Sequence, residues 1–271
     1  MLGPAGSVPG PYGGHVRTKL LAASAANAAW ITAAMRGVVG VEQALDVLQA
    51  LRVAPRVRQD GDQEFDGLAI AMQRWRQHGV TGWRYVPAAP ADAAGVPGPL
   101  TLRSTAIERG AALVSVDGQP SALLPSLDGS RPDEQSASLL LVERDADGHG
   151  LVAFDSVSEA DRALLEALHH AVEALDGLDV AQWREDAADL RQGWRDTPVL
   201  PPGASERATR LAARSLRVLD MLDIAMTDAG GSRTAHEMTT RARTFAQVAA
   251  AARSAHAAAW NGALTQANPR R

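Results

Sequence analysis

Apolar residues change their spacing along this chain near residue 157. Upstream they fall in short runs separated by glycine and proline, as in strands and turns. Downstream they recur every three or four residues for about a hundred residues, as in amphipathic helices. We therefore predict an α+β protein, with N-terminal helices and a small antiparallel sheet, followed by a C-terminal bundle of about four helices.

The same change of pattern divides the chain into three regions. Residues 1–14 are rich in glycine and proline and are expected to form a disordered tail. Residues 15–156 are expected to form a helical and antiparallel-sheet region, and residues 157–265 a helical bundle. The sequence leaves open whether the last two regions share one continuous core.

Three helices, a connector and a strand are expected before residue 87. The first two are helices over 15–36 and 41–51, and a connector over 54–61 follows them. The third helix is marked by the apolar stripe Phe65, Leu68, Met72 and Trp75, and Gly79 should cap its C-terminal end. The strand covers 81–86. The first helix contains the uncharged stretch Leu20–Met35, which is mostly alanine and too short to span a bilayer. We expect a packed helix there and no membrane span.

Two hairpins supply most of the predicted sheet. The first pairs 111–116 with 121–124 around the turn dipeptide Asp117–Gly118. The second pairs 139–143 with 151–154. Together with the strand before residue 87, they make an antiparallel sheet of four or five strands.

The bundle is predicted from helix caps and apolar spacing. Its four helices cover 159–176, 180–194, 206–228 and 235–261. Ser158 and Asp161 resemble a capping box for the first of these helices, and Ser205 should cap the third.

Charge is unevenly distributed, although the chain as a whole carries −4. Residues 117–200 hold 18 acidic and 6 basic side chains, whereas residues 201–271 hold 5 acidic and 10 basic ones. Blocks of opposite charge attract each other within a chain or between subunits. The chain has no cysteine, which excludes disulfides and zinc–thiolate sites and is typical of a cytoplasmic protein.

Four arginines form the candidate partner-binding surface. Arg207, Arg210, Arg214 and Arg217 recur at +3, +4 and +3, so they share one face of a helix opposite an apolar seam. A solvated surface helix with ion pairs inside the chain, such as Glu206 with Arg210, shows the same pattern. The row would also suit a phosphate backbone, but no nucleic-acid recognition motif accompanies it.

A second candidate site combines aromatic and basic side chains. Trp75, Trp83 and Tyr85 are expected to cluster where the third helix meets its strand, with Arg84 beside them. Such a group forms a ligand pocket or a partner hot spot, or it packs as core with its arginine turned outward. The pocket would lie beneath the proline- and glycine-rich loop over 87–99.

The sequence contains no recognisable set of catalytic residues or cofactor ligands. Glu166 and His169 have the Glu-x-x-His spacing of metal sites in helical bundles, but no second copy of the motif occurs. The stretch that begins at Asp145 opens like a calcium loop, but its twelfth position is Ser156 instead of glutamate. We therefore expect no metal and no cofactor, and no catalytic residue can be named.

One stretch of the chain resembles a known family. Residues 75–114, WRQHGVTGWRYVPAAPADAAGVPGPLTLRSTAIERGAALV, combine a helix, a short strand, a loop with a V-P-G-P motif and a further helix or extended piece before a hairpin. This stretch resembles an uncharacterised family of Ala- and Arg-rich actinobacterial proteins. The resemblance implies a high-GC bacterial origin and assigns no activity to any residue.

These observations favour a cytoplasmic, non-catalytic interaction or assembly protein. It would bind itself, as a homo-oligomer, or another protein through its C-terminal helices. The alanine-lined seam of the last helix, on which His256 is expected to be a core residue, supports close pairing of helices. Two alternatives remain: a small-ligand-binding regulator or enzyme with a pocket beneath the 87–99 loop, and a DNA-binding regulator.

Overall fold

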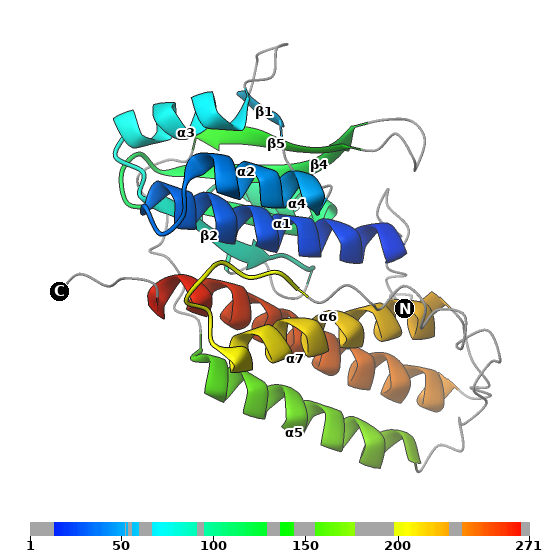
Figure 1. Cartoon of the computed structure of the whole chain (residues 1–271). Coiled ribbons are helices and arrows are strands. Elements are labelled where there is room, and N and C mark those ends of the chain that lie inside the picture. Colours follow the sequence, from blue (N-terminus) through cyan, green and yellow to red (C-terminus); the bar gives the residue numbers. More distant parts are fainter. Residues whose placement is uncertain are drawn as a thin grey trace.

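The computed structural model describes residues 14–51, 53, 56–59, 67–90, 95–128, 136–143, 155–176, 198–227 and 235–266. Within these ranges the chain forms helices at both ends and a five-stranded sheet between them (Figure 1). In chain order the elements are α1 (Gly14–Met35), α2 (Val41–Ala50), β1 (Arg56–Gln59), α3 (Leu68–Gln77), β2 (Gly82–Pro87), α4 (Leu100–Arg109), β3 (Ala111–Val116), β4 (Ser121–Asp128), β5 (Ser136–Glu143), α5 (Val157–Asp176), α6 (Glu206–Thr227) and α7 (Ala235–Gln266). This arrangement confirms the predicted α+β class.

The sheet has the strand order β1-β5-β4-β3-β2 and is mixed, not purely antiparallel. The three pairs among β2, β3, β4 and β5 are antiparallel, and the β3–β4 hairpin is the one predicted, but β1 pairs with β5 in parallel. The predicted hairpin of 139–143 with 151–154 is wrong for residues 139–141, because β4 and β1 already pair with them on either side. The prediction of a connector over 54–61 is therefore wrong for residues 56–59. β1 has a single apolar side chain, Val57, which is buried, so its alternation is too short to show in the sequence.

The turn between β3 and β4 forms where the sequence predicts it. Asp117 and Gly118 have φ values of 59° and 62°, the left-handed pair that a tight hairpin turn requires. A side chain on Gly118 would collide with the backbone of His78 and Gly79, and the Gln119 N–H donates to the His78 carbonyl at 3.0 Å. The turn is thus held against the end of α3.

α1 is buried on nearly all sides, as expected for the alanine-rich stretch Leu20–Met35. It contacts β2, β3 and β4 of the sheet and also α6 and α7. Trp30 Nε1 donates to the Val199 carbonyl at 2.8 Å, and Thr18 donates to Asp223 of α6 at 3.2 Å. Small side chains allow this central position, since Ala25, Ala29 and most other alanines of the helix are buried.

The bundle has three described helices, α5, α6 and α7, and the first two pack on α7. α5 and α6 each lie along α7, and α5 is the one farthest from the sheet (Figure 1). Within the described ranges no helix is long and apolar enough to cross a membrane. The predicted helix over 180–194, the predicted strand over 151–154 and the predicted tail up to residue 13 lie outside the described residues.

Candidate functional site

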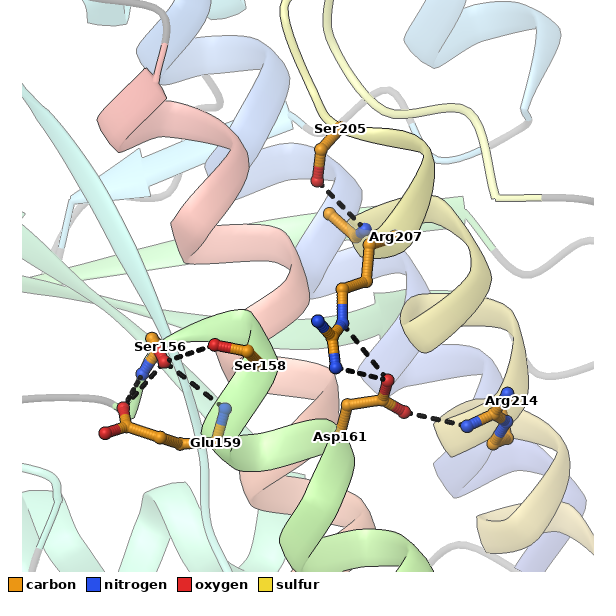
Figure 2. A network of polar contacts seen from close by, with 8 residues as sticks. Ser156, Ser158, Glu159, Asp161, Ser205, Arg207 and Arg214 are labelled. Carbon is orange, nitrogen blue, oxygen red and sulfur yellow. Dashed lines mark hydrogen bonds and ion pairs between the residues drawn. The ribbon is translucent and has the colours of Figure 1, made fainter.

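α5 begins with a capping box two residues earlier than the sequence pattern predicts (Figure 2). The Ser156 N–H donates to Glu159 Oε2 at 2.9 Å, and the Glu159 N–H donates to Ser156 Oγ at 3.2 Å. Both backbone groups at the helix start are therefore satisfied. The hydrogen bonds from the Ser156 hydroxyl and amide also lower the pKa of Glu159. The predicted box of Ser158 and Asp161 is wrong, because both residues already lie inside the helix.

Asp161 instead joins α5 to α6 through two of the four candidate arginines. Arg207 Nε and Nη2 each lie 3.2 Å from Asp161 Oδ2, and Arg214 Nη1 lies 2.7 Å from Asp161 Oδ1 (Figure 2). The Asp161 side chain is only 16% exposed, so these charge-assisted hydrogen bonds are partly shielded from water. Ser205 caps α6 as predicted, because its Oγ accepts from the Ala208 N–H at 3.2 Å.

The other two arginines lie on the exposed side of α6. Arg210 makes the predicted ion pair with Glu206, at 3.3 Å, and the two side chains are 66% and 82% exposed. Arg217 is exposed, and no hydrogen bond or ion pair joins it to another of the described residues. The structure thus divides the predicted row into two arginines that bind α5 and two that face solvent.

Apolar side chains continue the exposed row of α6. Met221 and Ile224 follow Arg217 at +4 and +3, and they are 44% and 39% exposed. On α5 one exposed row is polar: Arg162, Glu166, His169 and Glu173 recur at +4, +3 and +4, beside the exposed apolar Leu165 and Val172. Both rows lie opposite the buried stripes that pack on α7. We call these two rows together the outer face: Arg162, Glu166, His169 and Glu173 of α5, and Arg210, Arg217, Met221 and Ile224 of α6.

The α5 half of the outer face carries exposed ion pairs. Arg162 lies 3.8 Å from Glu166, and His169 and His170 lie 3.3 Å and 3.4 Å from the two oxygens of Glu173. Each of these side chains is at least 60% exposed. Among the described residues no three or more histidine, aspartate or glutamate side chains come together in a way that could hold a metal ion.

The second candidate site is divided between the two faces of the sheet. Trp75 and Trp83 make an edge-to-face contact with ring centroids 4.8 Å apart, and both belong to the main core together with Tyr85. Side chains alternate along β2, so Arg84 lies on the opposite face of the sheet from Trp83 and Tyr85. Val86 lies on the same face as Arg84 and belongs to a separate core beneath α4. Partial burial, and secondly the charge of Arg36, lower the pKa of Arg84. The three aromatic residues are thus brought together, while Arg84 is directed away from them.

Two side chains from distant helices complete the outer edge of β2. Thr32 Oγ1 accepts from the Trp83 N–H at 2.7 Å and donates to the Trp83 carbonyl at 3.0 Å. Asn261 does the same for Tyr85: its Oδ1 accepts from the Tyr85 N–H at 3.0 Å, and its Nδ2 donates to the Tyr85 carbonyl at 2.8 Å. These are the backbone groups that a further strand would bind, so the edge is closed to pairing with another chain.

A buried chain of hydrogen bonds connects the same strand to α7. Trp260 Nε1 can only donate, so His256 Nε2 accepts at 3.0 Å, and Nδ1 of the neutral ring then donates to the Tyr85 hydroxyl at 3.2 Å. Burial lowers the pKa of His256 to about 3 and raises the pKa of Tyr85. His256 is therefore neutral at physiological pH. We call this set the junction: Thr32, Trp83, Tyr85, His256, Trp260 and Asn261.

Sequence reasoning identified His256 as a core residue but missed its partners. The His256–Trp260 spacing of four residues on one helix is a local signal that could have revealed their contact. Thr32 and Asn261 have no such signal, because their partners lie 51 and 176 residues away in the chain.

Taken together, these features define an α+β protein whose helical bundle is fixed to the sheet at the junction and exposes charged and apolar residues on its outer face. The chain matches two family models, the N-terminal domain of Rv1486c-like protein over residues 24–146 and its C-terminal domain over residues 158–257. It therefore belongs to the Rv1486c-like proteins, and the expected actinobacterial family is confirmed. No curated protein and no solved structure matches the chain.

Proposed function

We propose that this protein is a non-catalytic interaction or assembly protein that acts through its C-terminal helices. The observation that carries the proposal is the exposed row of α6, in which Arg210 and Arg217 are followed on the same side by Met221 and Ile224. Arginine and methionine are enriched in protein interfaces relative to the rest of the surface. A surface helix without a partner would more often present polar side chains there.

The division of the arginine row favours a protein partner over a nucleic acid. Arg207 and Arg214 are bound to Asp161, so only Arg210 and Arg217 face outward from the original four. Phosphate-backbone binding draws its affinity from the number of phosphates neutralised, and two arginines beside two apolar side chains supply little of it. The mixed row is better suited to another protein surface.

The test is to reverse both outward arginines in untagged protein. Arg210→Glu with Arg217→Glu should abolish association, whether with itself in native mass spectrometry or with a protein captured from the source cells. The matched control is Arg243→Glu, which reverses an exposed charge on α7 outside the outer face. A wild-type chain that remains a monomer and captures no protein would rule the proposal out.

A small-ligand-binding role is the second candidate, because the buried indole N–H of Trp83 lacks an acceptor in the part of the chain that the structure describes. Trp83 Nε1 is buried and has no hydrogen-bond partner among the described residues. An unsatisfied buried N–H costs free energy that a ligand or a water could recover. Thermal-shift screening against a metabolite set tests this role: a hit should be lost in Trp83→Phe. If no compound stabilises the wild-type protein, this candidate is removed.

A further inference from the structure

We infer that the outer face binds a second copy of this chain, with α5 of each copy lying antiparallel on α6 of the other about a two-fold axis. This inference rests on the proposed function, since it uses the same surface and names the partner. Most soluble homo-oligomers are two-fold dimers whose interface pairs one surface patch with itself. The outer face has the complementary halves that such a patch needs.

The charges of the two halves have matching spacing. Glu166 and Glu173 are seven residues apart on α5, and Arg210 and Arg217 are seven residues apart on α6. Seven residues of helix advance about 10.5 Å in both cases. Two carboxylates on one copy can therefore meet two guanidiniums on the other without distortion of either helix.

The register of α5 and α6 within one chain follows from their contacts. Asp161 lies between Arg207 and Arg214, and Ala171 shares an apolar cluster with Leu222. The two helices are consequently parallel, and a residue of α5 is level with the residue of α6 about 50 positions later. On this scale Glu166 is level with Leu216, and Glu173 with Asp223.

The charges meet if the two-fold axis is perpendicular to the helices, passes between α5 and α6, and is level with Leu216 and Arg217. It places Glu166 of one copy opposite Arg217 of the other, and Glu173 opposite Arg210. By symmetry each contact occurs twice, which gives four ion pairs. Met221 then lies opposite Arg162 of the second copy, whose methylene stem covers it.

A parallel arrangement fits the charges less well. It would keep Glu166 beside Arg217, but it would set Glu173 beside Asp223 and Ile224. It would also need Glu159 to reach Arg210. The Glu159 carboxylate is already bound to Ser156 in the capping box. The ion pairs that the antiparallel contact replaces are exposed on the outer face, where such pairs contribute little to stability.

Two charge-reversed variants test the contact. One carries Arg210→Glu and Arg217→Glu, and the other carries Glu166→Arg and Glu173→Arg. Native mass spectrometry should show wild-type protein at twice the 28.5 kDa of one chain. Each variant alone should be monomeric, with its dissociation constant raised at least about a hundredfold by like charges. An equal mixture of the two should recover the dimer as a heterodimer, because every pair is then opposite in charge.

Three other outcomes overturn the inference, and each bears differently on the proposed function. A wild-type monomer that captures a different protein through Arg210 and Arg217 excludes a second copy as the partner but keeps the proposed function. A wild-type dimer that neither reversal weakens removes the outer face from both proposals. Folded, monomeric variants that do not form the heterodimer exclude the antiparallel register. If circular dichroism shows that a reversed variant is unfolded, Arg210→Ala with Arg217→Ala replaces it and must weaken the dimer.

Discussion

The junction and the outer face use similar side chains under opposite conditions. At the junction His256 and Tyr85 are each 1% exposed and hydrogen-bonded to each other. On the outer face the His169 side chain is 74% exposed and lies 3.3 Å from the exposed carboxylate of Glu173. A buried polar group is costly unless it is paired, so the junction admits one arrangement of α7 on the sheet. An exposed pair contributes little, so the outer face can exchange its ion pairs for those of a partner.

The largest expected difference in stability between the junction and the outer face comes from truncating an aromatic residue of the junction. Trp83→Ala should lower the free energy of unfolding by about 3–5 kcal/mol, because the ring is fully buried against Trp75 and leaves a cavity. Met221→Ala on the outer face should change it by about 0.5 kcal/mol or less. Urea unfolding followed by circular dichroism measures both. Equal losses in the two variants would mean that the outer face is as tightly packed as the junction.

The burial of His256 predicts that the stability of the protein depends on pH. The folded pKa of His256, about 3, lies below its unfolded value of about 6.5. Above pH 6.5 the ring is neutral in both states, and below it only the unfolded chain takes up the proton. The free energy of unfolding should therefore fall by about 2 kcal/mol between pH 6.5 and pH 5, and continue to fall towards pH 3.

A glutamine variant isolates this effect. His256→Gln should remove the extra slope between pH 7 and pH 5, even if the variant is less stable at neutral pH. Denaturant unfolding at several pH values gives the slopes. The same slope in wild-type protein and His256→Gln would show that His256 is protonated in the folded state.

The helix cap of α5 predicts a smaller loss of stability, which should differ between alanine variants of Ser156 and Ser158. Ser156→Ala should cost about 1 kcal/mol, because the Glu159 N–H loses its acceptor and the carboxylate loses a donor. Ser158→Ala should be nearly neutral, as the residue lies inside the helix and is exposed. Thermal unfolding compares the two. A larger loss for Ser158→Ala would restore the capping box that the sequence first suggested.

The sequence predicted the elements with strong local patterns and missed those that depend on distant contacts. For α4 the sequence did not distinguish a helix from an extended piece. The other described helices and the Asp117–Gly118 turn followed from spacing and turn chemistry within a few residues. β1 did not, since Val57 is its only apolar residue and the strand forms on the edge that β5 provides. The capping box was misplaced by two residues because two Ser-x-x-acid patterns overlap, and the one with glutamate is used.

The candidate site was predicted in composition but not in geometry. The four arginines share a helix face, as their spacing required, yet Asp161 binds two of them, a contact that links residues 46 and 53 positions apart. Local sequence reveals which side of a helix is polar. Local sequence does not reveal which other element of the fold will contact that side. That contact determines which arginines remain exposed.

The smallest expected effect is the coupling energy of an ion pair between α5 and α6, which a double-mutant cycle measures. Asp161→Ala and Arg214→Ala should show a coupling energy of about 0.5–1 kcal/mol, since the pair is short and its carboxylate is mostly buried. Glu206→Ala and Arg210→Ala, an exposed pair within one helix, should couple by about 0.3 kcal/mol. Urea unfolding of the single and double variants gives both values. If the second coupling equals or exceeds the first, Arg210 is held in its chain as firmly as Arg214, and the outer face loses the exchangeable charge on which association depends.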